Sequence, residues 1–225
     1  MRSKRYAKIS KLIDKAKLYP VAEALELLKK NPGAKFDETI EIHFRLGVDP
    51  KKGEQQVRGT VVLPFCFGKS KKVAAFVPEA RATEAKDAGA DIVYTETSVA
   101  ELQKSGKIEF DILVAVPEMM RAIGPLAKTL GPKGLMPSPK NETISPNLKK
   151  MIQELKQGKV AFKNDDTANI HQTIGKVSTD SSKLVANYEA LVAAIKKAKP
   201  ETAKGNYIKN IFLSTTMGPS VKIAL

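Results

Sequence analysis

Strict alternation of apolar and polar side chains over residues 39–46 is the feature that most restricts how this chain can fold. The segment reads T-I-E-I-H-F-R-L. Because successive side chains of a strand point to opposite faces, the pattern predicts a strand with one face in a core. The core face carries four apolar side chains, Ile40, Ile42, Phe44 and Leu46. The opposite face is polar, which is typical either of a solvated face or of a binding surface, and carries Thr39, Glu41, His43 and Arg45.

This strand needs partners, and the sequence offers them near both ends of the chain. Residues 57–67 are expected to return beside it as a hairpin, after the turn-forming stretch G-V-D-P-K-K-G. A two-stranded hairpin is only marginally stable alone. Further strand patterns follow late in the chain, at 160–163, 168–174 and 208–213. With a helix predicted over 184–198, they indicate a discontinuous, α/β-sandwich-like first domain made of residues 1–67 and 159–225.

Between these two parts, short strands that are apolar throughout alternate with helical patterns. The apolar runs lie at 72–77, 91–94 and 112–116. The helical patterns lie at 79–88, 100–104, 119–130 and 146–157. Such alternation indicates a parallel sheet covered on both faces. Residues 68–158 are therefore predicted to form an inserted, Rossmann-like three-layer α/β domain. The whole chain is predicted to be an α+β protein of two domains, with a hinge at the crossings near 67 and 159.

The charge balance predicts a polyanionic partner. The chain has 38 Lys and Arg against 24 Asp and Glu, a net charge of +14. Such an excess favours nucleic acid or an anionic membrane surface. A basic amphipathic helix is predicted over residues 2–17, but its apolar face is too weak for a membrane-surface helix, and a solvated basic face is the alternative interpretation. Residues 1–67 and 159–225 together carry +11 of the net charge. The predicted first domain is therefore expected to carry the surface that binds the polyanion.

Composition also excludes several kinds of site. Cys66 is the only cysteine and there are two histidines, so neither an internal disulfide nor a metal cluster is expected, and Cys66 is predicted to be a small buried side chain. No G-x-S-x-G or H-E-x-x-H motif is present, so no enzyme is predicted. The Gly-rich loop at 130–140 lacks the Walker spacing, so no cofactor is expected, although nucleotide binding by the α/β domain is a weaker alternative. No apolar run is long enough to span a membrane, and no secretory signal is expected, which favours the cytoplasm.

Near the C-terminus, small hydroxyl side chains gather around a methionine and a Gly-Pro turn. The segment at 214–220 reads S-T-T-M-G-P-S. Glycine allows a ligand to approach the backbone closely, and small hydroxyls suit phosphate and ribose oxygens. These residues carry a family resemblance together with K-F-D-E-T at 35–39 and L-G-P-K-G-L-M-P at 130–137. The three motifs, in this order and spacing, resemble the large-subunit ribosomal protein L-one family, whose protein lies on the mobile ribosomal RNA stalk.

The resemblance covers essentially the whole chain and implies both a site and partners. It implies that the ribosomal RNA site is formed by Phe36, Thr39, Glu41, Thr216, Met217 and Gly218. The implied partners are the stalk of large-subunit ribosomal RNA, deacylated tRNA at the exit site, and the messenger RNA of its own operon, whose translation it would repress. A ribosomal location in the cytoplasm and a monomeric free protein are also expected.

The residues themselves support contacts with structured RNA, which proteins recognise by shape, phosphates, 2′-hydroxyls and exposed bases. Candidate phosphate ligands are Lys35, Arg45 and Lys163. Candidate small hydrogen-bonding groups are Thr39, Ser214, Thr215, Thr216 and Ser220. Glu41 is a candidate hydrogen-bond acceptor, and Phe36 and Met217 are candidate apolar contacts. Gly218 is a candidate position for a close approach of RNA to the backbone, and His171 is a further candidate contact.

Several of these candidates have simpler explanations. Phe36 has the parity of the buried Ile40 and could belong to the core, Met217 could plug a domain edge, and Glu41 could pair with a lysine. Both histidines could be ordinary surface residues. A DNA-binding regulator is the alternative function, but such proteins usually present a recognition helix, whereas the suspected contacts here lie on strands.

Overall fold

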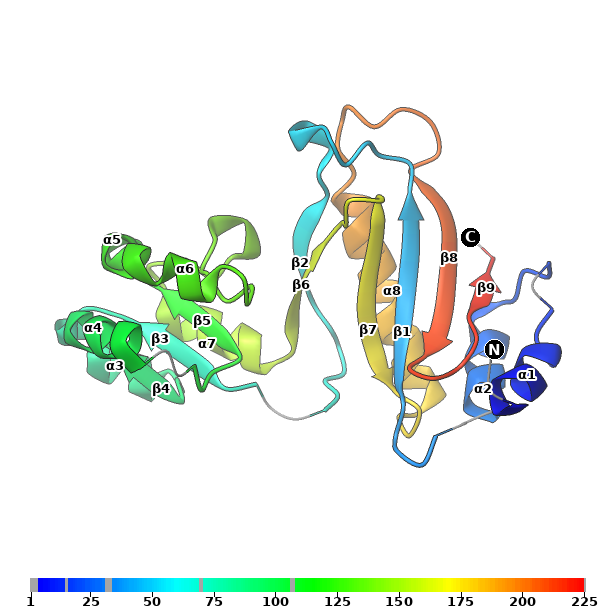
Figure 1. Cartoon of the computed structure of the whole chain (residues 1–225), viewed down its shortest axis with the longest axis horizontal. Helices are drawn as coiled ribbons and strands as arrows, with labels where there is room; N and C mark the ends of the chain where they lie inside the picture. Colours follow the sequence, from blue (N-terminus) through cyan, green and yellow to red (C-terminus); the bar gives the residue numbers. More distant parts are fainter. Residues whose placement is uncertain (1–3, 15, 31–33, 69–70, 106–107, 225) are drawn as a thin grey trace. The chain divides into compact units, whose positions relative to one another are not determined.

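The computed structural model describes residues 4–14, 16–30, 34–68, 71–105 and 108–224 and is mixed α and β with several sheets, which agrees with the predicted α+β class (Figure 1). The chain divides into two compact units, each with its own sheet and core. The first consists of Met1–Gly68 and Ala161–Leu225, and the second of Lys69–Val160.

The first unit is built on a four-stranded antiparallel sheet in which segments far apart in sequence lie side by side. The strand order is β7-β1-β8-β9. The bounds are β1 Thr39–Leu46, β7 Asn169–Lys176, β8 Ile208–Thr215 and β9 Val221–Ile223. The predicted strand 39–46 is confirmed, and its alternating burial has the predicted parity.

One face of this sheet packs against two helices, α2 (Val21–Lys30) and α8 (Ser181–Lys197). Figure 1 shows α8 lying along β7 and β1 on that side. The fully buried side chains of the sheet include Ile40, Ile42 and Leu213, and those of the helices include Leu25 and Leu191. Burying this apolar face is the main force holding the sheet, because each such side chain contributes roughly 1.5–3 kcal/mol. The opposite face stays available for polar groups.

The expected hairpin between residues 39–46 and 57–67 is wrong. The later strand, β2 (Arg58–Val62), pairs instead with β6 (Lys159–Lys163) in a separate two-stranded sheet. Both edges of β1 are occupied by β7 and β8, so no edge is left for β2. After β2 the chain is held on α8, where Asn187 Nδ2 donates to the carbonyl of Phe65 at 2.8 Å. This segment is at the surface, and Cys66 is exposed rather than buried as predicted.

The backbone at Gly59 in β2 lies close to the neighbouring strand, as a glycine within a strand suggests. A Cβ atom at this position would lie 2.7 Å from the ring of Phe162 on β6. The 3₁₀ turn η1 (Gly53–Gln55) precedes β2. At the N-terminal end, α1 spans Lys4–Lys11, so the basic helix predicted over 2–17 ends earlier than expected; positions 2, 3 and 15 of that range lie outside the described residues.

The second unit contains a three-stranded parallel sheet with helices on both faces, which is the arrangement predicted from its apolar strands. The strand order is β4-β3-β5, with bounds Ile92–Tyr94, Val73–Phe76 and Ile112–Ala115. One face packs against α3 (Ala82–Asp87) and α7 (Leu148–Lys156). The other packs against α4 (Glu96–Ser105), α5 (Met120–Ile123) and α6 (Ala127–Leu130).

Short 3₁₀ turns divide the helical pattern predicted over 119–130. They are η3 (Pro117–Met119) and η4 (Gly124–Leu126), while η2 (Glu79–Arg81) and η5 (Pro139–Asn141) lie elsewhere in this unit. Pro125 inside η4 explains the interruption, because proline cannot donate a helical hydrogen bond. The following Gly-rich loop packs Leu135 and Met136 against the core beside α5 and α6.

Candidate nucleic-acid interface

The two segments singled out in the sequence meet at Thr39 and Thr216. The Thr216 amide donates to the Thr39 carbonyl at 3.1 Å. The Thr216 hydroxyl accepts from the Thr39 amide at 3.1 Å and lies 3.3 Å from the Thr39 carbonyl, to which it donates. Strand pairing continues this junction, since Ile40 lies opposite Thr215. The Thr216 hydroxyl therefore joins residues 177 positions apart and orients both segments.

Two neighbouring carboxylates fix the K-F-D-E-T segment. Glu38 is only 1% exposed, and its side chain accepts from the amide of Met217 at 3.2 Å. Asp37 accepts from both the hydroxyl and the amide of Ser178, at 2.7 and 3.1 Å. The Ser178 hydroxyl is the main reason that the pKa of Asp37 lies below its ordinary value. Sequence reasoning missed the role of Glu38; the available signal was a carboxylate placed directly before a buried strand.

With these acids holding the backbone, two large apolar side chains remain at the surface. Phe36 is 56% exposed and Met217 is 50% exposed. The interpretation of Phe36 as a core residue is therefore wrong. Lys35, Thr216 and Ser220 are exposed as well. Solvent-facing apolar side chains beside hydroxyls and a lysine are suited to contact with nucleotide bases and sugars.

The turn that carries Met217 depends on a small residue at 218. The Gly218 amide donates to the Thr215 carbonyl at 3.1 Å. A Cβ atom on Gly218 would overlap the hydroxyl oxygen of Thr215. Thr215 itself is only 3% exposed, so it supports the turn from inside. Gly218 thus allows the tight turn that presents Met217.

One contact at this turn comes from a part of the chain that sequence reasoning did not include in the site. Arg5 on α1 donates from Nη2 to the Met217 carbonyl at 3.3 Å. In its first turn α1 has no acidic residue, and Lys8 and Lys11 lie in its last turn. The basic helix therefore lies beside the exposed methionine. Its contact depends on tertiary structure, and the only sequence signal was its net positive charge.

The polar face of the sheet carries Glu41 and Arg45, and the strand register shifts beside each of them. Glu41 lies opposite Thr173 of β7 and Ser214 of β8. Arg45 is exposed and lies between Asn169 and Asn210. Lys163 is exposed at the end of β6, outside this sheet.

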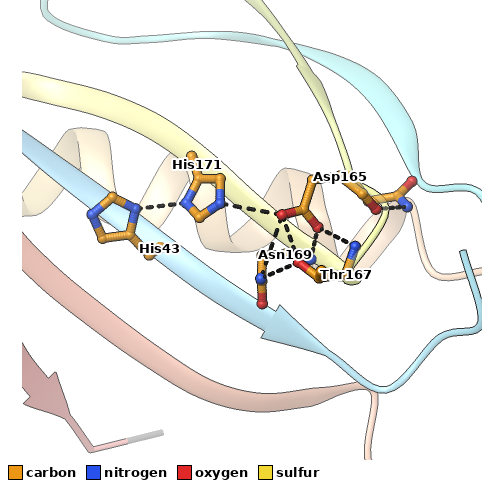
Figure 2. Close-up of polar contacts among 6 residues, drawn as sticks. His43, Asp165, Thr167, Asn169 and His171 are labelled. Carbon is orange, nitrogen blue, oxygen red and sulfur yellow. Dashed lines mark hydrogen bonds and ion pairs between the residues drawn. The ribbon is translucent and has the colours of Figure 1, made fainter.

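At the centre of this face, both histidines belong to one line of polar contacts (Figure 2). Nε2 of His43 lies 2.9 Å from Ser214 Oγ, and its Nδ1 lies 2.8 Å from Nδ1 of His171. Nε2 of His171 is 3.5 Å from Oδ2 of Asp165. Asp165 is held in turn by the amides of Thr167 and Asn169, at 2.9 and 2.6 Å.

These surroundings shift the pKa values of two groups in the line. Partial desolvation raises the pKa of Asp165, but the hydrogen bonds from Asn169 and Thr167 outweigh it and lower the pKa to about 2. Burial lowers the pKa of His43, and the nearby His171 lowers it further, although Glu41 acts in the opposite direction. Near neutral pH, Asp165 is therefore ionised and His43 is neutral.

Comparison with known families decides which protein family this is. The family model described as the ribosomal protein L1p/L10e family matches residues 28–219. The chain belongs to the ribosomal protein L1p/L10e family. The match includes Thr39, Thr216, Met217 and Gly218. The resemblance inferred from the three motifs is thereby confirmed.

Membership of the L1p/L10e family makes this chain a large-subunit ribosomal protein that binds ribosomal RNA, located on the ribosome in the cytoplasm. The family is a structural, RNA-binding family and not an enzyme class. Among the residues that the structure describes, no helix is long and apolar enough to cross a membrane, and no group of three or more His, Cys, Asp or Glu could hold a metal ion. Arg5 on α1 lies outside the matched range.

Proposed function

We propose that this L1p/L10e family member binds the stalk of large-subunit ribosomal RNA through the first unit. The proposed surface combines the Thr39–Thr216 junction with the polar sheet face. The observation that carries the proposal is that this junction joins two distant motifs and leaves Phe36 and Met217 exposed beside it. Exposed apolar groups of this size are costly in water and gain by stacking on bases.

The chemistry of the surface suits folded RNA. Lys35, Arg45 and Lys163 are exposed cations that can neutralise phosphates. Ser214 and Ser220 can hydrogen-bond to phosphate or ribose oxygens, and Glu41 can accept from a 2′-hydroxyl or a base amino group. By contrast, Thr215 and the hydroxyl of Thr216 act within the protein, so we assign them a positioning role.

The distribution of charge supports the same unit. Met1–Gly68 and Ala161–Leu225 contain 23 basic and 13 acidic residues, a net charge of +10, whereas Lys69–Val160 has 15 and 11, a net charge of +4. We propose that residues 1–67 and 159–225 are the main RNA-binding domain and that residues 68–158 are an inserted second domain. The more basic unit is the one expected to attract RNA.

The decisive test compares exposed apolar side chains inside and outside the proposed surface. Phe36→Ala and Met217→Ala should each weaken binding to a stalk ribosomal RNA fragment by about tenfold, since a stacked contact contributes roughly 1–3 kcal/mol. Val62→Ala, on the 43% exposed Val62 of β2, is the matched control and should leave affinity unchanged. Equal affinities for all four proteins would reject this surface. Tighter binding to duplex DNA than to the RNA at matched salt would favour the DNA-binding alternative.

We further propose two finer roles for the same protein: contact with deacylated tRNA at the exit site, and repression of its own operon by binding messenger RNA. Both follow from the family resemblance of the three motifs. If one surface binds two similar RNAs, the ribosomal fragment should compete with the messenger RNA leader for the protein. Binding of both RNAs at once to one protein molecule would argue against repression through this surface.

A further inference from the structure

The line of contacts on the polar sheet face has a definite direction. A neutral imidazole carries a proton on only one ring nitrogen, so of the two Nδ1 atoms at 2.8 Å one donates and the other accepts. Ionised Asp165 faces Nε2 of His171, which therefore carries the proton of that ring. His171 then accepts at Nδ1 from His43, and His43 Nε2 accepts the hydroxyl proton of Ser214. With both rings neutral, every proton in the line points toward Asp165.

One added proton reverses this direction. The pair of rings takes up the proton, and the negative charge of Asp165 favours the arrangement in which Nδ1 of His171 is the donor. His43 must then accept at Nδ1 and carry its own proton on Nε2, from which it donates to Ser214. The Ser214 hydroxyl proton is released to bind a ligand. A second added proton would place two N–H groups head to head at 2.8 Å, so the pair takes up only one.

We infer that Asp165, His171, His43 and Ser214 form a proton relay that couples RNA binding on this sheet face to the uptake of one proton. This inference rests on the proposed function and names a regulation of the same surface. Phosphate oxygens only accept hydrogen bonds, so they favour the protonated relay, in which Ser214 can donate. The added charge on His171, whose side chain is 54% exposed, acts in the same direction.

Other charged side chains also lie on this sheet face. They are Glu41 and Arg45 of β1, Lys176 of β7 and Lys222 of β9. Histidine is the side-chain type whose charge ordinarily changes between about pH 5 and pH 8. The chain has only two histidines, and both belong to the relay. RNA affinity in this pH range therefore reports mainly on the relay.

The first test needs no RNA. In the free protein, ¹⁵N chemical shifts of the imidazole nitrogens identify which atom of each ring carries the proton. We expect His43 to carry its proton on Nδ1 at pH 8 and on Nε2 at pH 6, as the pair of rings takes up one proton. His43 protonated on Nε2 at pH 8 would overturn the relay. Because this result is independent of RNA, it separates failure of the relay from failure of the proposed function.

The second test measures affinity for the stalk ribosomal RNA fragment at constant ionic strength. From pH 8 to pH 6 the wild-type protein should bind about tenfold more tightly, within the limit of tenfold per pH unit for uptake of one proton. His171→Gln should abolish this change. Ser214→Ala should remove more than half of it, because the released hydroxyl is lost while the charge of His171 stays.

Full retention of the pH dependence in Ser214→Ala would show that the charge of His171 acts alone and would overturn the relay. Asp165→Asn and Asp166→Asn form a matched pair, since both remove one negative charge from the same turn. Asp165→Asn should lose the pH dependence, whereas Asp166→Asn should keep it. Equal behaviour of these two variants would also overturn the inference.

Discussion

The hydroxyl of Thr216 illustrates how a single side chain can hold two distant segments of a surface together. It accepts from the Thr39 amide and donates to the Thr39 carbonyl. Thr216→Val keeps the shape of the side chain but removes both bonds. We expect the free energy of unfolding to fall by roughly 1–2 kcal/mol, because both bonds lie within the protein, and RNA affinity to fall because the segments of Thr39 and Thr216 lose their alignment. Filter binding and circular dichroism would measure the two effects.

Thr216→Ser is the matched control, since it retains the hydroxyl and loses only a methyl group. Its RNA affinity should stay within about twofold of wild type, because the bonds to Thr39 remain possible. If Thr216→Ser weakened binding as much as Thr216→Val, the methyl group would be the important contact, and the positioning role of the hydroxyl would be wrong.

Asp165 gives a prediction for stability at acid pH. Its folded pKa of about 2 lies below the ordinary value of 3.8, so ionised Asp165 stabilises the folded state above about pH 4. The stabilisation is lost as the pH falls toward 2. Asp165→Asn should lower the free energy of unfolding at pH 7 by about 1 kcal/mol, less than full linkage would give because the side chain is 38% exposed.

Urea unfolding at pH 7 and at pH 2 would measure this difference. The gap between wild type and Asp165→Asn should narrow as the pH falls, because the wild-type carboxylate becomes protonated. Asp166→Asn again serves as the control and should differ little from wild type at either pH. A constant gap across the pH range would mean that the turn depends on the shape of Asp165 and not on its charge.

At the scale of elements, local pattern was enough to predict β1 but not its neighbours. Alternation over eight residues fixed the strand and its buried face. The sequence around β2 has the same kind of pattern, but pairing depends on which strand edges are free. Because β7 and β8 occupy both edges of β1, β2 pairs with β6. Competition between distant strands cannot be read from a single segment.

The same reason explains which site residues the sequence could predict. Motif positions such as Thr39, Met217 and Gly218 became candidates because they lie in the alternating strand, in the hydroxyl cluster and in the motifs that carry the family resemblance. Glu38 and Arg5 were missed because their contacts with the Met217 backbone span about two hundred residues. Such contacts are set by the tertiary arrangement of the sheet and α1, which no local pattern encodes.

The turn after β8 is the element on which the proposed surface depends most, and Gly218→Ala tests it. The added methyl group would overlap the buried hydroxyl of Thr215, so the turn must shift. We expect a loss of roughly 1–3 kcal/mol in the free energy of unfolding, as for overpacked sites. RNA affinity should also fall, because Met217 moves. Thermal unfolding and RNA binding would measure the two effects.

A double-mutant cycle identifies the clash. Thr215→Ala removes the overlapping oxygen, so Gly218→Ala should cost less in that background than in the wild type. Gly53→Ala is the control, because a Cβ atom at Gly53 meets no atom within 4 Å. It should leave stability unchanged or slightly higher. Additive effects of the Thr215 and Gly218 variants would show that the strain lies elsewhere.

At the scale of the whole molecule, the net charge can act in two ways. If RNA is attracted by the general charge of the first unit, its whole net charge of +10 contributes to RNA binding. If binding is confined to the proposed surface, the phosphate contacts come from the three exposed cations Lys35, Arg45 and Lys163. Hydroxyl and stacking contacts release no counterions, so they add affinity without adding salt dependence.

Salt titration separates these two cases. The slope of log affinity against log salt should be about −2 to −3 for the three-cation surface, and on the order of −7 or steeper for the whole charge. Arg45→Gln should make the slope less steep by about 1. Lys197→Gln, on an exposed residue of α8 in the first unit but outside the proposed surface, removes the same charge and should leave the slope unchanged. If both variants changed the slope equally, RNA would be responding to the diffuse charge of the molecule, and the localised surface would be wrong.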